Sequence, residues 1–465
     1  MRAANRYLLL AGTVLFALVA CTEPTSSRTP SLDVRLGKAA SGPTVTAATP
    51  SSAAQNSTLD VQISGSGFDA GSSAQWLLNG TPDSRVRTNS TRYVSSTSLV
   101  ANITVAQDAV PAAYDVAVTA ASGKKGIGTE KFTVLAMEQL SSPDGASGAH
   151  DVNTLGVIAG STPGGCDGYT IPVLWVNGIV KALPVPAGLC RGRAWRINEA
   201  GEVLGQMYPA GATSLTQSIP LLWKPVGDGF TVQELGLASG VRPYDILDFN
   251  ESAHAVVNIS IREAYWWSEA SGYVRLANPP NSTGCYADGV NDLDEIVGEC
   301  WMNDITAGKN IATTVFWSSP TSAPAILPRL AGYNYAHEPA DLNNLGVAVG
   351  QALNTKGSTI TETGVRYLRN GTGVWTIEIL PDLGAGGTDP RDINDDGWII
   401  GRSNITSARR HAFLWRQGQQ MKDLGAVGPE SWADGVTPVG ASELLVVGQT
   451  TSGKVNRAVL WRPQL

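Results

Sequence analysis

Residues 43 to 135 alternate between hydrophobic and polar side chains in short runs that turn-forming residues separate. Two such runs are residues 59–63 (LDVQI) and residues 114–119 (YDVAVT). Alternation with a period of two predicts β-strands that bury one face. Several short strands of this kind, divided by Gly, Pro and Ser, are typical of two sheets packed face to face. We therefore predict a β-sandwich for residues 43–135.

From residue 136 to residue 465 the chain repeats one unit seven times. Each unit has a short strand ending in Asn, a tight turn, an apolar run ending in Gly, an aromatic third strand and a brief fourth strand. The clearest unit comprises residues 391–401 (RDINDDGWIIG), 411–416 (HAFLWR) and 421–425 (MKDLG). The third-strand aromatics lie 44 to 50 residues apart, at Trp175, Trp223, Trp267, Trp317, Tyr367, Trp415 and Trp461. Periods of this length with four short strands predict the blades of a β-propeller.

The two ends of the repeat region predict that the ring closes. The last unit stops soon after Trp461 and has no fourth strand of its own, whereas residues 137–140 (MEQL) precede the first unit and resemble residues 421–424 (MKDL). Pairing the early segment with the last unit would leave no bare sheet edge. The expected fold is therefore all-β, with an immunoglobulin-like β-sandwich followed by a seven-bladed β-propeller over residues 136–465. A β-solenoid is the alternative.

The N-terminus has the pattern of an export signal. Arg2 and Arg6 precede an uncharged run over residues 7–20, which is followed by Cys21. The sequence LVAC at residues 18–21 resembles the lipobox of bacterial lipoproteins, and this resemblance implies a lipidated Cys21; an ordinary secretory signal is the alternative. We expect a signal peptide at residues 1–20, a disordered Ser/Thr/Pro-rich tether at residues 21–42, and an outer-membrane or cell-surface location with the lipid as the only membrane link.

Two segments resemble known families. Residues 43–135, with the turn ISGSGF at 63–68 and the run PAAYDV at 111–116, resemble an IPT/TIG immunoglobulin-like domain. The repeats resemble the HAF extracellular repeat family, whose name-giving triplet stands at residues 411–413, and the resemblance is weakest in the third unit, where Asn258 replaces the usual Gly. The first resemblance implies a spacer or interaction module. The second implies an exported repeat protein without a defined activity.

Charge and cysteine content restrict the classes of ligand. The net charge is −7 and no basic cluster is present, which argues against binding to nucleic acid. Besides Cys21, four cysteines remain, none at a metal-binding C-x-x-C spacing, so disulfides are favoured over zinc. Three pairings are open for Cys166, Cys190, Cys285 and Cys300. We hypothesise the pairs 166–190 and 285–300 because they join neighbouring segments.

Aromatic and histidine residues vary near the start of the innermost strand of the units. This end of the strand would open at the mouth of the central channel, a concave place where ligands tend to bind. Packing of the loops is the alternative role. The candidate ligand-binding residues are His150, Trp195, Tyr244, Tyr286, Tyr335, His337 and Trp432.

Evidence for catalysis is weaker. Acids recur on the innermost strand at Asp151, Asp245, Asp341 and Asp392, where they could act as acid and base in a glycosidase-like site. In two units the acid moves by one residue, to Asp288 and Asp434, and a shift of one residue reverses the face of a strand. No G-x-S-x-G, P-loop or H-E-x-x-H motif occurs. We therefore assign no catalytic residue and predict a non-catalytic binding or scaffold module for an extracellular protein or polysaccharide. The alternative is an extracellular glycan-acting enzyme that uses carboxylates at the channel mouth.

One turn resembles a calcium loop. Residues 392–397 (DINDDG) match the start of such a loop, but its twelfth position would be Ser403 instead of Glu. The equivalent turns keep only Asn and Gly, which suit a tight hairpin. We predict a structural turn and no metal or other cofactor, with a structural calcium ion as the alternative.

Overall fold

The computed structural model describes residues 42–463, except residues 56, 107, 144, 215–216, 237–244, 261, 305–308 and 357–358. The predictions for the signal peptide, for Cys21 and for the tether therefore lie outside the described residues. Within the described part of the chain, no helix has the length and apolar character that crossing a membrane requires.

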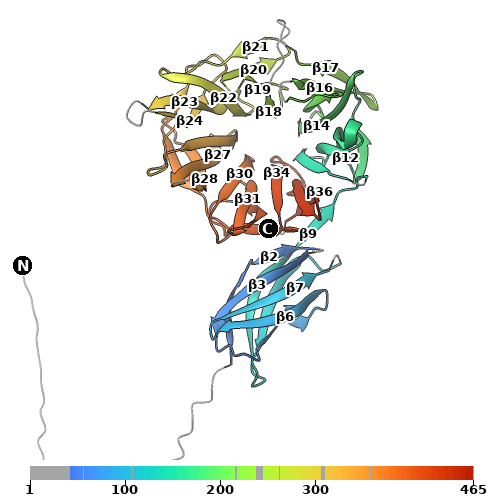
Figure 1. Cartoon of the computed structure of the whole chain (residues 1–465), viewed down its shortest axis with the longest axis vertical. Helices are drawn as coiled ribbons and strands as arrows, with labels where there is room; N and C mark the ends of the chain where they lie inside the picture. Colours follow the sequence, from blue (N-terminus) through green and yellow to red (C-terminus); the bar gives the residue numbers. More distant parts are fainter. Residues whose placement is uncertain are drawn as a thin grey trace, which may run out of the picture. The chain divides into compact units, whose positions relative to one another are not determined.

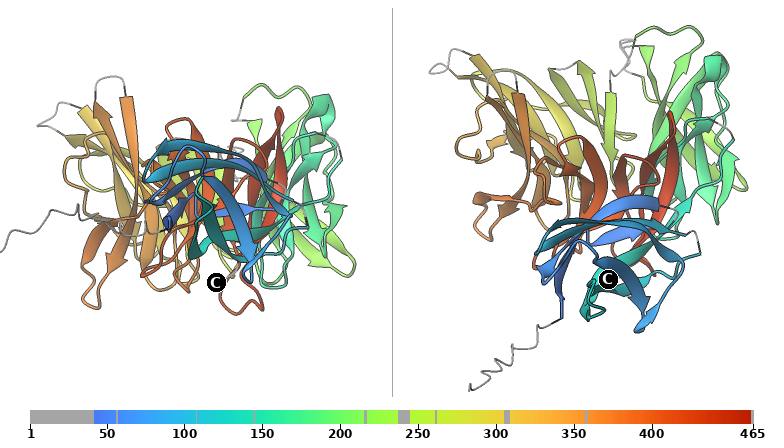
Figure 2. Two further views of the ribbon diagram at one scale, coloured as in Figure 1. Left: turned by 90° about the horizontal axis from the view of Figure 1, so that it is seen from below. Right: turned by 60° about the horizontal axis from the view of Figure 1, so that its bottom comes forward.

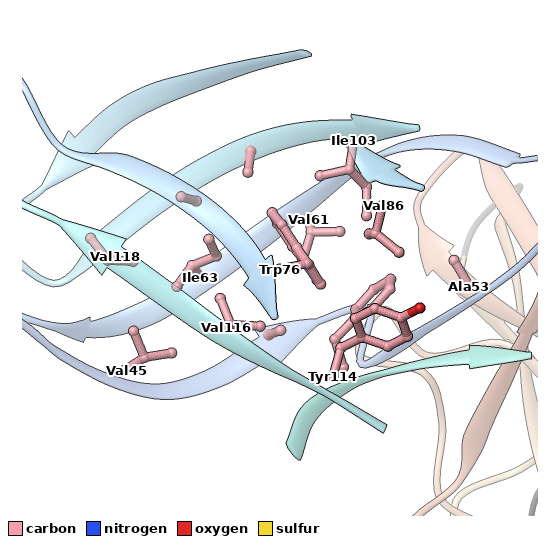
Figure 3. Packing of buried hydrophobic residues seen from close by; sticks show 14 of the residues in the cluster. Val45, Ala53, Val61, Ile63, Trp76, Val86, Ile103, Tyr114, Val116 and Val118 are labelled. Carbon is pink, nitrogen blue, oxygen red and sulfur yellow. The ribbon is translucent and has the colours of Figure 1, made fainter. Parts of the chain in front are cut away.

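The first strands form two antiparallel sheets that enclose a hydrophobic core (Figures 1 and 3). One sheet has the order β1 (Thr44–Thr49), β3 (Ser57–Ser66), β7 (Ser98–Val105) and β6 (Val86–Ser95). The other has β9 (Lys125–Gln139), β8 (Ala112–Thr119), β4 (Ser73–Leu78) and β5 (Thr81–Pro82), and β2 (Ser52–Ala54) runs parallel to β9. Trp76, Tyr114 and Phe132 are fully buried between the sheets.

The remaining strands form four-stranded antiparallel blades that follow one another around a ring, as in a β-propeller (Figures 1 and 2). Blade 1 contains β10 (Gly148–Val152), β11 (Ile158–Pro163), β12 (Thr170–Val176) and β13 (Ile179–Ala182). Blade 2 contains β14 (Leu189–Ile197), β15 (Val203–Pro209), β16 (Ile219–Val226) and β17 (Gly229–Glu234). Blade 3 contains β18 (Asp245–Phe249), β19 (Ala255–Ser260), β20 (Glu263–Ser268) and β21 (Gly272–Arg275). A short 3-10 helix, η1 (Cys166–Gly168), lies in blade 1.

Blades 4 to 7 continue the ring. Blade 4 contains β22 (Ser282–Val290), β23 (Ile296–Asp304), β24 (Lys309–Trp317) and β25 (Ala325–Ile326), and blade 5 contains β26 (Ala336–Leu342), β27 (Val347–Lys356), β28 (Thr359–Arg369) and β29 (Trp375–Ile379). Blade 6 contains β30 (Thr388–Ile393), β31 (Ile399–Thr406), β32 (Arg409–Trp415) and β33 (Lys422–Gly425). Blade 7 contains β34 (Ser431–Val436), β35 (Val446–Ser452) and β36 (Val455–Arg462).

Strand β9 belongs to both parts of the fold. Its first two thirds pair with β8 in the sandwich, and its last residues pair antiparallel with β36, where Met137 lies opposite Trp461. The early segment thus supplies the fourth strand of blade 7, which confirms the pairing predicted from the chain ends.

The aromatic third-strand residues pack between blades. Trp175, Trp223 and Trp317 are fully buried. Their indole Nε1 groups donate to backbone oxygens that follow the outer strand of the preceding blade: to Ser141 at 2.7 Å, to Pro184 at 2.8 Å and to Ala277 at 2.8 Å. Because each of these indoles is buried and its donor is satisfied, the repeated aromatic holds adjacent blades together.

The structure contains both hypothesised disulfides. One joins Cys166 to Cys190 and the other joins Cys285 to Cys300. The second pair lies within blade 4, where the two cysteines are directly opposite each other on β22 and β23.

Candidate binding site in the central channel

Every innermost strand contains a β-bulge at the same place. The pairing with the second strand shifts by one residue there, so that one extra residue is inserted. A bulge redirects the inserted side chain relative to a regular strand. The inserted residues are His150, Trp195, Leu247, Asp288, Ala340, Arg391 and Asp434, and all seven line one cavity of about 650 Å³. We call this space the channel cavity.

The repeated Gly of the second strand lies opposite the residue before the bulge, where the two backbones approach closely. A Cβ on Gly298 would lie 2.1 Å from the backbone oxygen of Tyr286, and a Cβ on Gly350 would lie 2.3 Å from that of Glu338. In blade 3 the residue at this register is Val257, which pairs with Ile246, so the sequence alignment that placed Asn258 there was wrong by one residue. The buried Asn258 instead exchanges two hydrogen bonds of 2.9 Å with the backbone of Ala287 in the next blade.

Acidic side chains outnumber basic ones in the lining of the channel cavity. They are Asp288, Glu299, Glu338, Asp389 and Asp434. The main cations are Arg391, whose Nη2 lies 3.0 Å from Asp389, and Arg196. Burial, reinforced by the nearby Glu338, raises the pKa of Glu299 to about 8. Burial also raises the pKa of Glu338. Glu299 therefore keeps its proton at neutral pH and stands near a second carboxyl group, that of Glu338.

His150 is buried beside an acid and an indole. Its Nδ1 lies 3.7 Å from Asp434 Oδ2, and its ring centroid lies 4.5 Å from that of Trp195. Burial lowers the pKa of His150, so the imidazole is neutral at pH 7. Its Nε2 has no hydrogen-bond partner in the described part of the chain. A ligand in the cavity could supply one.

Three of the sequence-predicted ligand residues line the channel cavity: His150, Trp195 and Tyr286. Tyr244 lies outside the described residues. The other three are not among the lining residues. Tyr335 is 46% exposed on a connecting segment. His337 is fully buried, accepts a hydrogen bond from the Leu330 backbone at 2.9 Å and has a pKa that burial lowers to about 4. Trp432 lies on β34 two residues before the bulge, the position from which Tyr286 lines the cavity in blade 4.

Sequence reasoning missed the lining residues that come from second strands and from flanking positions. Glu299, Trp301 and Gln351 belong to β23 and β27, and Glu338 and Asp389 lie two residues before the bulges of their blades. The usable signal for the bulge was the residue that precedes the inner-strand acid by one position, because in blades 1, 3, 5 and 6 this is the inserted residue.

The repeated acids hold neighbouring blades together. Asp151, Asp341 and Asp392 accept hydrogen bonds of 2.8, 3.1 and 2.9 Å from backbone N–H groups of the following blade. In blade 3 the equivalent residue is Asp248, which accepts from Val290 at 2.8 Å, and not Asp245, which pairs three positions earlier on the strand. The acid–base pairing considered from sequence therefore used a wrong residue in blade 3.

Arg196 occupies the equivalent position in blade 2 and faces these acids. Its Nε lies 2.8 Å from Asp248 Oδ1, and its charge also lowers the pKa of Asp151 and of Asp341. Burial nevertheless dominates: it raises the pKa of Asp151 to about 7 and the pKa of Asp341 well above its ordinary value. The buried guanidinium of Arg196 therefore compensates the negative charge of these acids.

The turn that resembles a calcium loop is held by hydrogen bonds. Asn394 Oδ1 accepts from the Trp398 backbone at 3.0 Å, and Asp395 Oδ1 accepts from the Asn344 backbone at 2.7 Å. Ser403 is buried 3.1 Å from the hydroxyl of Thr388. Among the described residues, no group of three or more His, Cys, Asp and Glu side chains is arranged to hold a metal ion.

Comparison with known proteins finds similarity to solved structures only. No protein-family model and no curated protein matches the chain. The β-propeller domain of the Trilobed protease from Pyrococcus furiosus is 11% identical over 69% of this chain and 94% of its own, with a TM-score of 0.45. YCF48 bound to a D1 peptide is 12% identical over 71% of this chain and 95% of its own, also with a TM-score of 0.45. The strand pairing defines the class as an all-β protein with a β-propeller fold.

Proposed function

We propose that this chain is an exported cell-surface lipoprotein of the HAF repeat type, in which an IPT/TIG-like immunoglobulin domain carries a closed seven-bladed propeller. Anchoring would occur through a lipid on Cys21, and the two disulfides suit an oxidising compartment. The Tyr114 hydroxyl donates to the Val110 backbone oxygen at 3.2 Å, as in the tyrosine corner of immunoglobulin-like sandwiches. The propeller binds an extracellular protein or polysaccharide and performs no chemistry.

The observation that carries this proposal is the variety of residues at the bulge position. The repeated Asp, Asn, Gly and Trp positions serve packing and backbone hydrogen bonds. The inserted position instead differs from blade to blade and presents aromatic, acidic, basic and apolar side chains to one cavity. A concave site that combines apolar surface with a few polar groups is typical of ligand binding.

The test is a binding screen with the purified mature protein in detergent, on a glycan and polysaccharide array and by cross-linking on intact cells. Trp195→Ala and Tyr286→Ala alter the channel cavity, and Tyr335→Ala is the control because Tyr335 is exposed outside it. We expect binding to fall about tenfold or more in the cavity variants and to persist in the control. Unchanged binding in both cavity variants would contradict the proposal.

A second candidate function is glycoside hydrolysis, favoured by Glu299 and Glu338. A protonated carboxylic acid near a second carboxyl group is the pair that glycosidases use as acid and base or nucleophile. Release of reducing ends from a polysaccharide, abolished by both Glu299→Gln and Glu338→Gln, would establish it. Binding to a glycan that remains uncut after prolonged incubation would favour the non-catalytic role.

A further inference from the structure

A second pocket lies where blades 1 and 2 meet, beside the channel cavity. Its volume is about 380 Å³, and its walls include Tyr169, Arg191, Arg193, Trp195, Gln206 and Tyr208. We call it the side pocket. Of these residues, only Trp195 also lines the channel cavity.

The Cys166–Cys190 disulfide positions two walls of the side pocket. Cys166 begins η1, which is followed by Tyr169, and Cys190 directly precedes Arg191 on β14. The Arg191 guanidinium carbon lies 4.2 Å from the centre of the Tyr169 ring and 5.3 Å from that of Tyr208. Two aromatic rings therefore hold this guanidinium, which restricts its orientation before any ligand arrives.

The side pocket is basic, in contrast to the channel cavity. No Asp or Glu is among its lining residues, whereas Arg191 and Arg193 both are. Within the described part of the chain, neither guanidinium lies within 4.0 Å of a carboxylate in any ion pair that the structure contains. The Arg193 guanidinium lies 5.4 Å from the Trp195 ring centre. Two cations without acidic partners attract an anion, and arginine binds carboxylate and sulfate groups through paired N–H donors.

Buried polar atoms of the lining residues lack partners. Gln206 is only 8% exposed and donates from Nε2 to the Tyr208 hydroxyl at 3.0 Å, but its Oε1 accepts no hydrogen bond from the described residues. Arg191 Nε and Trp195 Nε1 are likewise buried without an acceptor there. An unpaired buried polar group costs about 1–3 kcal/mol. A ligand with both hydroxyl donors and oxygen acceptors could satisfy groups of both kinds.

We propose that the side pocket binds an acidic sugar unit, with its carboxylate or sulfate at Arg191 and Arg193 and its hydroxyl groups near Gln206 and Tyr208. The aromatic walls suit the apolar faces of a sugar ring, and Tyr169 is 52% exposed. The inference rests on the proposed binding function and narrows its ligand to an acidic polysaccharide. A lone inorganic anion would use the arginines but not the aromatic and amide groups.

The experiment is calorimetric titration of the mature protein in detergent with three probes: trigalacturonate, a sulfated galactose trisaccharide and neutral galactotriose. Inorganic phosphate serves as a competitor. We expect the carboxylated or the sulfated probe to bind about tenfold more tightly than the neutral one, since one charge-assisted interaction contributes about that factor. Which of the two anionic probes binds more tightly identifies the anionic group.

Variants locate the binding site. Arg191→Gln and the exposed Arg193→Gln are expected to weaken binding of the acidic probe about tenfold or more. Arg275→Gln is the matched control, because Arg275 is an exposed arginine of blade 3. Circular dichroism confirms folding of each variant, and Arg193→Gln remains informative if Arg191→Gln does not fold.

With the unaltered protein, three outcomes would overturn the inference: no binding of either acidic probe, equal affinity for acidic and neutral probes, or displacement by inorganic phosphate at equal concentration. Loss of acidic-probe binding in Tyr286→Ala but not in Arg193→Gln would also overturn it, while supporting the proposed function at the channel cavity. These outcomes distinguish a failure of the inference about the side pocket from a failure of the proposed binding function.

Discussion

The backbone oxygen of Tyr286 lies 2.1 Å from the place where a Cβ on Gly298 would stand. The approach lies beside the bulge at Asp288 in the inner strand of blade 4. The same relationship recurs between Glu338 and Gly350 in blade 5. In these blades the repeated Gly and the residue that lines the channel cavity therefore belong to one backbone irregularity.

Replacing Gly298 with Ala is expected to destabilise the protein by about 2–3 kcal/mol, because the methyl group can be accommodated only if the backbone moves. The free energy of unfolding in urea measures this loss. Gly371→Ala is the control, since its Cβ would meet no atom within 4 Å. Equal stability of the two variants would show that the close approach does not constrain the strand.

The charge of Arg196 is expected to be essential for stability. Arg196→Met leaves the buried Asp248 without its ion pair, which should cost about 3–5 kcal/mol at pH 7. The stability lost in Arg196→Met should be smaller at about pH 4 than at pH 7. Without the guanidinium, the acids of the folded variant bind protons more tightly than the same acids in the unfolded chain, so acid favours the folded variant. Urea unfolding at both pH values tests this.

Arg275→Met serves as the comparison for Arg196→Met. Arg275 pairs with Glu263 at 3.3 Å on the surface, with 56% of its side chain exposed, and its removal should cost less than about 1 kcal/mol. A loss for Arg196→Met that is equally small, or that does not vary with pH, would contradict the assignment of Arg196 as the compensating charge.

Glu299 should make stability depend on pH. Its pKa is about 8 in the folded protein and has an ordinary value of 4.5. Between these values the folded state holds a proton that the unfolded state has lost, so the free energy of unfolding should fall as pH rises from about 4.5 to about 8. Glu299→Gln should remove this pH-dependent part of the free energy of unfolding. It amounts to a few kcal/mol, because each unit of difference between the folded and unfolded pKa contributes roughly 1.4 kcal/mol.

The measurement compares unfolding of wild type and Glu299→Gln at about pH 5, 7 and 9. The exposed Glu269→Gln, at a surface ion pair with Lys224, provides the control. Stability curves of wild type and Glu299→Gln that run parallel across this range would show that Glu299 is ionised at neutral pH, and would remove support for the hydrolytic alternative.

His411 is expected to act in folding. Its Nδ1 lies 3.0 Å from both carboxylate oxygens of Asp423, and both side chains are buried. His411→Gln should cost about 2–4 kcal/mol because it weakens a buried charge-assisted contact. Ligand binding by the folded fraction should be unchanged, since His411 does not line the channel cavity.

The partly exposed pair of His254 and Asp294, 2.8 Å apart, offers a matched comparison for His411. His254→Gln should cost less than about 1 kcal/mol in the same thermal or urea unfolding assay. A larger loss of stability in His254→Gln than in His411→Gln would refute the structural role assigned to His411.

Much of the fold could be predicted because its signals are periodic. The spacing of the buried aromatics marks the blades, and the similarity between residues 137–140 and residues 421–424 anticipated the pairing of Met137 with Trp461. Such features follow from the demands of packing and closure, which recur in each unit. The spacing of Cys166 from Cys190 and of Cys285 from Cys300 likewise reflected proximity within the ring.

The candidate site was less accessible to sequence reasoning for a physical reason. A bulge inserts one residue and breaks the period-two rule, so side chains after it face the opposite way. In the third unit an acid stands at both 245 and 248, and only the strand pairing shows that Asp248 is the equivalent residue. Glu299 and Gln351 come from second strands, and only the folded ring brings them beside Glu338. The residues of the cavity therefore share no local pattern.

The shared strand β9 sets an order on how the protein can mature. The segment around Met137 is synthesised before all the blades, whereas its partner around Trp461 follows six of them. The sandwich can pair β8 with β9 early, but blade 7 must wait until β36 has been made. Closure of the ring thus reports that every blade has been synthesised, and a chain truncated before β36 would expose an unpaired edge for quality-control proteases to recognise.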